Sequence, residues 1–342
     1  MKCPVCGNDC IRDAHEIIGI MPEVFAPCPD CTPLVMNKDA PPPPVSLDVC
    51  SCGRRFLDVV CAHVYLIMVE EGDLLLNDPL RRIGSPMIHP GFAMESAPFL
   101  PEKSLVLLSP LVSRESAERI IKEVPEARGV VRSGDFIPGE LDANLTREPR
   151  TYELLAGCDV RADIFFTQTS PIVLYKEQSK IHIEFPRGYD PKIIAVGVRV
   201  RRHNPRVFVD ACCGAGTLGI LAGMIGTPHV VLNDAWYAAA FWTSYNLRVN
   251  MESMLLERVD IKKDYTALSK NPVVREPAVV AVAEGEQTVE VYQGDFFRLP
   301  PFLPKERPIL TVFDLFEKKD RPLRERIRKE WLESVGGDIF IP

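Results

Sequence analysis

Short apolar runs alternate with stretches long enough for a helix in the second half of the chain. Val207–Asp210 and His229–Asp234 are apolar runs that end in an acid, and helical stretches follow them at 217–225 and 235–250. Such alternation predicts a parallel sheet with helices on its faces, and therefore an α/β domain. The pattern continues with apolar runs at 288–292, 308–316 and 338–341 and a charged helix at 321–334.

The preceding region has a less regular pattern. An apolar run at 104–109, helical spacing at 113–123 and a second apolar run at 129–131 predict a strand, helix, strand unit. We assign it to a small α/β domain over residues 66–165. Further on, the runs at 172–175 and 180–185 resemble a β-hairpin, and residues 193–200 are predicted to form another strand.

Eight of the eleven cysteines fall within the first 61 residues, and six of them form three close pairs. The paired cysteines are Cys3, Cys6, Cys28, Cys31, Cys50 and Cys52. Two such pairs on tight turns complete a tetrahedral zinc site, so residues 1–65 are expected to form a cysteine-rich, zinc-binding domain. Spacing leaves open which four share an ion, and an iron–sulfur cluster is an alternative. Cys10, Cys61 and His63 are possible ligands of a second metal site, but they are expected to be incidental.

Composition and charge fit a folded, cytoplasmic protein of several domains. Of the 342 residues, 46% are hydrophobic and 25% are charged, and the longest apolar stretch is too short to span a bilayer. The N-terminus has no apolar segment typical of a secretory signal. The formal net charge of −7 argues weakly against a surface built only to coat nucleic acid.

A glycine-rich turn joins the first acid-ended run to the next helix. It reads Asp210-Ala-Cys-Cys-Gly214-Ala-Gly216-Thr217, and such a turn lets a ligand approach the backbone at the carboxyl end of a strand. Asp234 ends the next strand, where an acid can accept hydrogen bonds from both hydroxyls of a ribose. Asp295 and Phe296 follow a third strand, where a carboxylate can accept from an adenine amino group and a phenyl ring can cover the base.

This series of motifs resembles the class I family of S-adenosylmethionine (SAM)-dependent methyltransferases, over residues 190–342. The first motif is similar to that of some RNA and DNA base methyltransferases, although Cys212 stands where many members carry a glycine. The resemblance implies a Rossmann-like methyltransferase domain over 166–342, with SAM as cofactor. The cofactor-binding residues that it implies are Asp210, Ala211, Gly214, Gly216, Asp234, Asp295 and Phe296.

Two other functions are compatible with the glycine turn. Gly214, Gly216 and Gly219 satisfy the G-x-G-x-x-G pattern of dinucleotide-binding enzymes, but Asp210 lies four residues before the first of them and lengthens the turn. The later Gly-Asp-Phe-Phe segment also favours SAM. A second alternative is a non-catalytic protein that binds SAM or a dinucleotide, against which the intact acids argue.

Asp314 ends the fourth apolar run beside the glycine turn and is the candidate catalytic residue. Its alternative role is to cap the next helix or to pair with Lys318 or Arg321. The sequence Phe313-Asp-Leu-Phe316 lacks the Asn/Asp-Pro-Pro-Tyr/Phe signature of amine methyltransferases, which argues against methylation of a base amino group.

The expected substrate is a macromolecule, and RNA and protein remain alternatives. Two basic clusters favour RNA, although the second also fits a solvated helix face. They comprise Arg199, Arg201, Arg202 and Arg206, and Arg321, Arg324, Arg326, Arg328 and Lys329. The chain also ends before the C-terminal hairpin of the family's sheet, so we expect residues 172–185, or the strand near 193, to fill that sheet edge.

Overall fold

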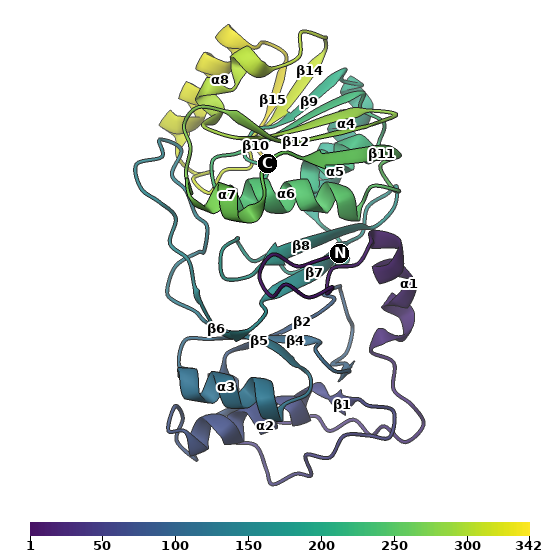
Figure 1. Ribbon diagram of the computed structural model, residues 1–342, viewed down its shortest axis with the longest axis vertical. Helices are drawn as coiled ribbons and strands as arrows, with labels where there is room; N and C mark the ends of the chain where they lie inside the picture. The colour runs from purple at the N-terminus through teal and green to yellow at the C-terminus, as the bar shows by residue number, and fades with distance from the viewer.

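The computed structural model describes residues 1–342, and it has a mixed α/β fold built in layers. A large, mainly parallel sheet lies at one end and a smaller sheet at the other, with a two-stranded ribbon between them (Figure 1). None of the helices combines the length and the apolar character that a membrane crossing requires.

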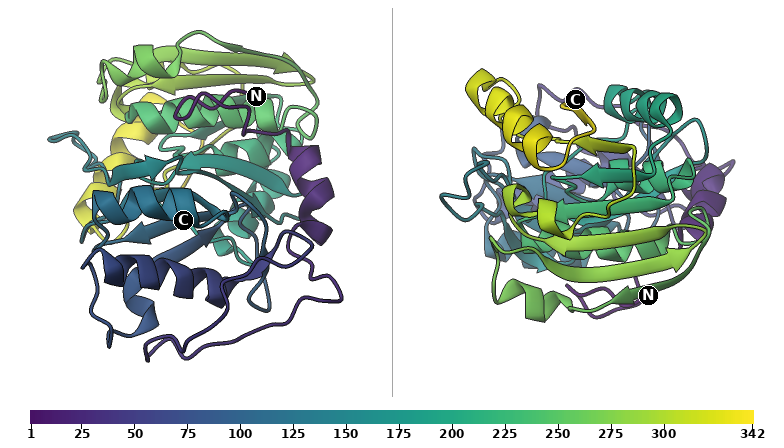
Figure 2. Two further views of the ribbon diagram at one scale, coloured as in Figure 1. Left: turned by 60° about the horizontal axis from the view of Figure 1, so that its bottom comes forward. Right: turned by 90° about the horizontal axis from the view of Figure 1, so that it is seen from above.

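The large sheet has seven strands, of which five are parallel. Their order is β11 (Leu256–Ile261), β12 (Ala278–Gly285), β13 (Thr288–Gln293), β10 (His229–Asp234), β9 (Val207–Asp210), β14 (Ile309–Val312) and β15 (Asp338–Phe340). Figure 2 shows the antiparallel β11 and β12 at one edge of the sheet and the C-terminal strand at the other. The predicted parallel sheet is confirmed, because β9 pairs in parallel with β10 and β14, and β10 pairs in parallel with β13.

Alternate residues of the central strands face two separate hydrophobic clusters. Phe208 and Val230 face the helices α4 (Pro191–His203), α5 (Thr217–Met224) and α6 (Tyr237–Val249). Val209 and Val231 face α8 (Arg321–Ser334), whose Trp331 is buried there. Both faces of the sheet are therefore covered, as the unbroken apolar character of these strands requires.

The prediction of a strand at 193–200 is wrong, because these residues lie in α4. Asp190 caps this helix by accepting from the backbone N–H groups of Lys192 and Ile193, and Pro191 occupies the first helical position. The apolar residues Ile193, Val196 and Val200 then face the core at helical spacing. Start signals and tertiary packing thus outweigh the β-propensity of the branched residues.

The predicted hairpin of 172–175 with 180–185 is also wrong. β8 (Ile172–Glu177) pairs with the preceding β7 (Val160–Phe165), and residues 180–185 form no strand. The free edge of β8 is occupied by two amide side chains, Asn246 of α6 and the C-capping residue Asn250. Asn246 donates to and accepts from the backbone of Tyr175, and Asn250 does the same with Val173.

The expectation about the sheet edge fails for the same reason. The outermost strand beside β14 is β15, and neither α4 nor the β7–β8 ribbon joins the large sheet. The ribbon instead packs on α6. The two antiparallel strands of the large sheet, β11 and β12, lie at the edge opposite β15.

The smaller sheet has the order β2 (Ser85–Ile88), β4 (Leu105–Ser109), β5 (Ala127–Arg132) and β6 (Glu153–Gly157). The predicted strand, helix, strand unit is confirmed as β4, α3 (Arg114–Glu123) and β5. A hydrophobic cluster that extends from Phe25 to Leu155 joins α3 to α2 (Leu57–Glu70). The three-domain division stays a prediction; its boundary at residue 65 falls within α2, and that at 165 falls between the paired β7 and β8.

The N-terminal residues wrap around the ribbon and the smaller sheet. They include α1 (Ala14–Val24) and the short strand β1 (Arg55–Phe56), which pairs with β3 (Phe99–Leu100) further along the chain. The remaining short elements are α7 (Tyr265–Ser269), η1 (Leu80–Ile83), η2 (Phe296–Arg298) and η3 (Pro300–Phe302).

Candidate functional site

The glycine turn lies between β9 and α5, at the carboxyl edge of the large sheet. Gly214 and Gly216 have φ values of +54° and +93°, which side chains with a Cβ rarely adopt. The backbone N–H of Gly214 donates to Asp234 Oδ2 at 3.0 Å, so the turn is fastened to the end of β10. Asp295 follows β13, the next parallel strand.

A cavity of about 290 Å³ opens at these strand ends. Of the residues predicted to bind the cofactor or to act in catalysis, all but Gly216 line it, and Gly216 lies between two residues that do. The lining residues from the prediction are Asp210, Ala211, Gly214, Asp234, Asp295, Phe296 and Asp314. The structure thus brings together residues that are more than one hundred positions apart in the sequence.

The cavity wall near the glycine turn is acidic. Burial, with the charges of Asp314 and Asp234, holds the pKa of Asp210 well above its usual range, and Asp210 Oδ1 has no hydrogen-bond partner. Burial also raises the pKa of Asp234 to about 6 and raises the pKa of Asp295. Unpaired acidic acceptors inside a cavity favour a ligand that brings hydrogen-bond donors or positive charge.

Asp314 lines the same cavity and lies between two ammonium groups. Its Oδ2 accepts from Lys192 Nζ at 2.9 Å, and its Oδ1 lies 2.5 Å from Lys318 Nζ. The cap of α8 is Asp320, and Arg321 does not pair with Asp314. Among the alternatives for Asp314, pairing with Lys318 is therefore confirmed, while helix capping is excluded.

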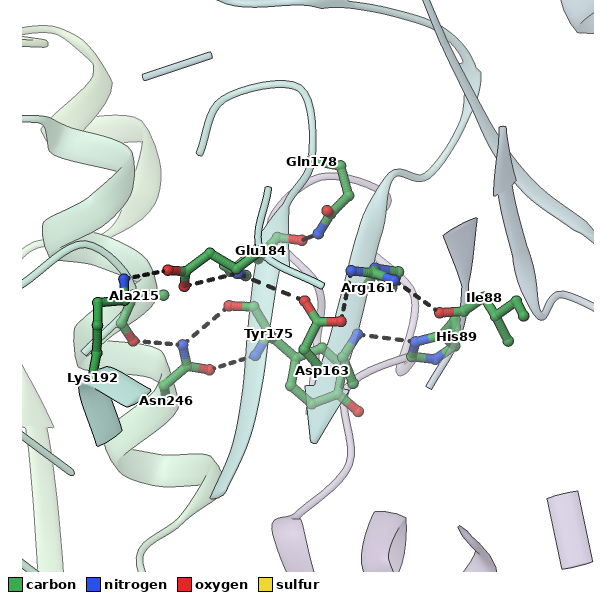
Figure 3. A network of polar contacts seen from close by, with 12 residues as sticks. Ile88, His89, Arg161, Asp163, Tyr175, Gln178, Glu184, Lys192, Ala215 and Asn246 are labelled. Atoms are coloured by element: carbon green, nitrogen blue, oxygen red, sulfur yellow. Dashed lines mark hydrogen bonds and ion pairs between the residues drawn. The ribbon is translucent and has the colours of Figure 1, made fainter. Parts of the chain in front are cut away.

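Asp314 ends a row of alternating charges that extends from the ribbon into the cavity. The row runs through Arg161, Asp163, Lys176, Glu184, Lys192, Asp314 and Lys318, with neighbouring groups 2.5–3.8 Å apart. Figure 3 shows Glu184 between Lys192 and the ribbon residues. Burial alone raises the pKa of Glu184, but Lys176 and Lys192 outweigh burial and lower this pKa to about 2. Each charge is thus offset by its neighbours.

Sequence reasoning did not find Lys176, Glu184 or Lys192 as cavity residues. The only signal was Asp190-Pro191, which starts α4 and thereby directs Lys192 to the cavity. Nothing in the sequence marks Glu184, because it lies in an irregular segment whose position depends on the packing of β8 against α6.

The outer wall of the cavity is a strap, residues 133–152, that joins β5 to β6. It extends from the smaller sheet toward α8 along one side of the molecule (Figure 1). Arg275 donates to the carbonyl groups of Asn144 and Leu145 at 3.0 Å each, and the N–H of Ala143 donates to Glu317 at 3.1 Å. The smaller sheet therefore contributes to the same cavity as the large sheet.

None of the arginines and lysines of the two basic clusters lines the cavity. Arg321 and Arg326 pair with glutamates one turn away on α8, as expected of a solvated helix face. Arg199 lies over the ring of Phe340, with 3.7 Å between the guanidinium carbon and the ring centroid.

The cysteines form two groups of four, and in each group the Sγ atoms lie within 4.8 Å of one another. The first group, here called the paired group, is Cys28, Cys31, Cys50 and Cys52. The second, here called the mixed group, is Cys3, Cys6, Cys10 and Cys158. Setting Cys10 aside was wrong, and Cys158 was missed because it is 148 positions away from Cys10 (158 − 10). Cys61 and His63 belong to neither group, as expected.

The spacing of the thiols fits a single tetrahedral ion. Four sulfur atoms about 2.3 Å from zinc lie about 3.8 Å apart, because a tetrahedron's edge is about 1.6 times the distance from its centre to a corner. In the paired group, Cys28 Sγ lies 3.7 Å from Cys31 Sγ and 3.5 Å from Cys50 Sγ. The donor set of this group therefore fits zinc.

No protein-family model and no curated protein sequence matches the chain. Among solved structures, the chain is similar to Trm1 from Pyrococcus horikoshii in complex with S-adenosyl-L-methionine, at 20% identity over 45% of this chain and 36% of that one, with a TM-score of 0.31. It is similar to a transferase of the same organism at 15% identity over 82% and 78%, with a TM-score of 0.40. It is similar to aTrm5 in complex with tRNALeu at 16% identity over 60% and 51%, with a TM-score of 0.30. The chain thus spans less than two thirds of the matched Trm1 and aTrm5 chains.

Proposed function

We propose that this chain is a SAM-dependent methyltransferase that acts on a macromolecular acceptor, with a Rossmann-like catalytic domain over 166–342. The observation that carries the proposal is the convergence of Asp210, Asp234 and Asp295 on one cavity, from the ends of three neighbouring parallel strands. Ligands of open α/β sheets bind at this edge, outside the carboxyl ends of the strands.

Each part of the cofactor has a matching group in the cavity. Asp234 would accept from the ribose hydroxyls, and Asp295 with Phe296 would bind the adenine. Asp210, whose Oδ1 is buried without a partner, would accept from the amino group of the methionine portion, beside Ala211, Gly214 and Gly216. Bound SAM supplies a sulfonium methyl group that a nucleophile displaces in line, so these residues act by positioning and by excluding water.

The charge of the cavity favours SAM over a dinucleotide. A pyrophosphate would bring two negative charges next to Asp210 and Asp234, whose pKa values are already raised by burial. The sulfonium and the ammonium group of SAM would instead offset these carboxylates. Calorimetry with SAM, its demethylated product and NAD tests this, and binding of NAD alone would refute the proposal.

The paired group is proposed to hold a structural zinc ion. A segment that buries little apolar surface gains its stability from such a metal, because ion binding and folding are coupled. Together with the smaller sheet and the strap, this segment would select the acceptor.

The class of acceptor is decided by a labelling experiment. The purified protein is incubated with methyl-labelled SAM and either total RNA, including tRNA, or total protein, each from cells that lack this chain. Label in one fraction identifies the acceptor class. Label in neither, from a protein that binds SAM, would support the non-catalytic alternative.

Replacing Asp314 by Asn is expected to lower the rate of methyl transfer by about 10²–10³-fold. The substitution removes the negative charge between Lys192 and Lys318 at the acceptor end of the cavity. SAM affinity should change little, because Asp314 lies outside the adenosine contacts. The measurement is single-turnover labelling together with calorimetry, with Glu325→Gln on the exposed face of α8 as control. A normal rate would remove Asp314 from the catalytic site.

SAM affinity is expected to fall as the pH is lowered through about 6. Burial raises the pKa of Asp234 to about 6 in the free protein, and the ribose contacts need the ionised carboxylate. Below this pKa, binding must release a proton, so the affinity falls by up to about tenfold per pH unit. Burial shifts the pKa values of Asp210 and Asp295 in the same direction. Calorimetry from pH 5 to 8 measures this, and Asp234→Asn should remove the step near 6.

A further inference from the structure

We infer that Cys3, Cys6, Cys10 and Cys158 bind a second zinc ion, which fastens the N-terminus of the chain to the turn between β6 and β7. In this mixed group, Cys3 Sγ lies 3.8 Å from Cys158 Sγ, and Cys6 Sγ lies 3.6 Å from Cys10 Sγ. These separations match the edge of a zinc–thiolate tetrahedron, about 3.8 Å.

The spacing also distinguishes one ion from a multinuclear iron–sulfur cluster. In a four-iron cluster each cysteine binds a different iron, so the ligand sulfur atoms lie farther apart than around a shared ion. All four Sγ atoms of the mixed group lie within 4.8 Å of one another. The group therefore fits a single tetrahedral ion.

The surroundings of the mixed group supply the charge that a metal–tetrathiolate unit requires. Four thiolates with one divalent ion carry a net charge of −2, which is costly to bury without a cation. Arg128 lines the same groove as Cys6, Cys10 and Cys158, and its Nη2 is buried without a hydrogen-bond partner. Arg128 Nε donates to the carbonyl of Val160, which fixes the guanidinium beside the cysteines.

The position of the mixed group explains how the N-terminus is held. The hydroxyl of Tyr245 on α6 donates to the carbonyl of Lys2, and the N–H of Arg12 donates to the hydroxyl of Tyr175 on β8. Ile11 and Ile17 are buried in the hydrophobic cluster of the ribbon and α6. An ion bound by Cys158 would therefore join the first residues of the chain to the ribbon against which they pack.

The first test is the metal content of the full-length wild-type protein, purified without chelator and measured by mass spectrometry of zinc and iron. Two zinc ions per chain and no iron are expected. One zinc ion, iron in the mixed group, or a disulfide between its cysteines would overturn the inference. This measurement needs no variant, so it does not depend on whether a variant folds.

The second test locates the ion. Cys158→Ser is expected to retain one zinc ion and to lower Tm by roughly 10 °C. Cys10→Ser, at a half-buried position, is a milder change with the same expected loss of one ion. Cys61→Ala is the matched control, because Cys61 is buried but belongs to neither group. Two retained zinc ions in both serine variants would refute the site.

The two metal sites are separated by a double variant. Cys31→Ser alone is expected to lose the zinc of the paired group, and the double variant Cys31→Ser with Cys158→Ser is expected to lose both ions. If the double variant lost no more zinc than Cys31→Ser alone, the mixed group would not be a site of its own. None of these cysteines lines the proposed cofactor cavity, so SAM binding tests the proposed function independently of the metal count.

Discussion

Replacing Asp234 by Ala is expected to weaken SAM binding by about 10²–10³-fold. Hydrogen bonds to a charged group contribute about 1.5–3 kcal/mol each, so the loss of two ribose contacts near the lower end of this range costs about 3–4 kcal/mol. At about 1.4 kcal/mol per factor of ten, this corresponds to the stated decrease in affinity. Calorimetry with SAM measures it directly.

The same carboxylate also shapes the site, so the experiment needs a structural control. Asp234 Oδ2 accepts from Gly214 N and Oδ1 from Trp236 N, at 3.0 and 2.9 Å. Asp234→Asn keeps one acceptor oxygen, and its SAM affinity should lie between those of the wild type and Asp234→Ala. Asp260→Ala changes an exposed acid of β11 and should leave the affinity unchanged. Wild-type affinity in Asp234→Ala would place the cofactor elsewhere in the protein.

Replacing Asn246 by Leu is expected to lower the free energy of unfolding by about 3–5 kcal/mol. The Asn246 amide accepts from Tyr175 N at 2.8 Å and donates to the carbonyls of Tyr175 and Ala215 at 3.0 Å each. All these groups are buried, and each polar group left without a partner costs about 1–3 kcal/mol. Figure 3 shows Asn246 between the ribbon and Ala215 of the glycine turn.

Urea unfolding of the variant and the wild type measures this difference. Ser244→Ala in the same helix is the matched control, because the hydroxyl of Ser244 donates only to the carbonyl of Ala240, one turn away. A loss of less than about 1 kcal/mol is expected there. If Asn246→Leu were no more destabilising than Ser244→Ala, the amide would not be the link between ribbon and sheet.

Local sequence determined the five parallel strands of the large sheet and the positions of its acids, but not the antiparallel β11 and β12. Val207–Asp210 and His229–Asp234 each contain three consecutive buried apolar residues and end in an acid, so both the strand and its acidic end follow from the pattern. The same holds for α8, where the predicted bounds agree with the structure, and for the unit of β4, α3 and β5.

Pairing between distant segments was decided only by the tertiary structure. The side chains of Asn246 and Asn250 occupy the edge of β8, and this prevents the hairpin that residues 172–185 suggest locally. The helix at 193–200 has a local start signal in Asp190 and Pro191, but its packing on α5 outweighs the strand preference of its branched side chains.

The sequence by itself determined the local features of the candidate sites, which are a glycine turn with three acids at strand ends and cysteines in close pairs. Only the tertiary structure decided that Cys158 joins Cys3, Cys6 and Cys10, and that a row of charges leads from the ribbon to Asp314. The physical reason is that local patterns encode hydrogen bonding and burial along one segment. Contacts between side chains from different segments depend instead on how the packed layers come together.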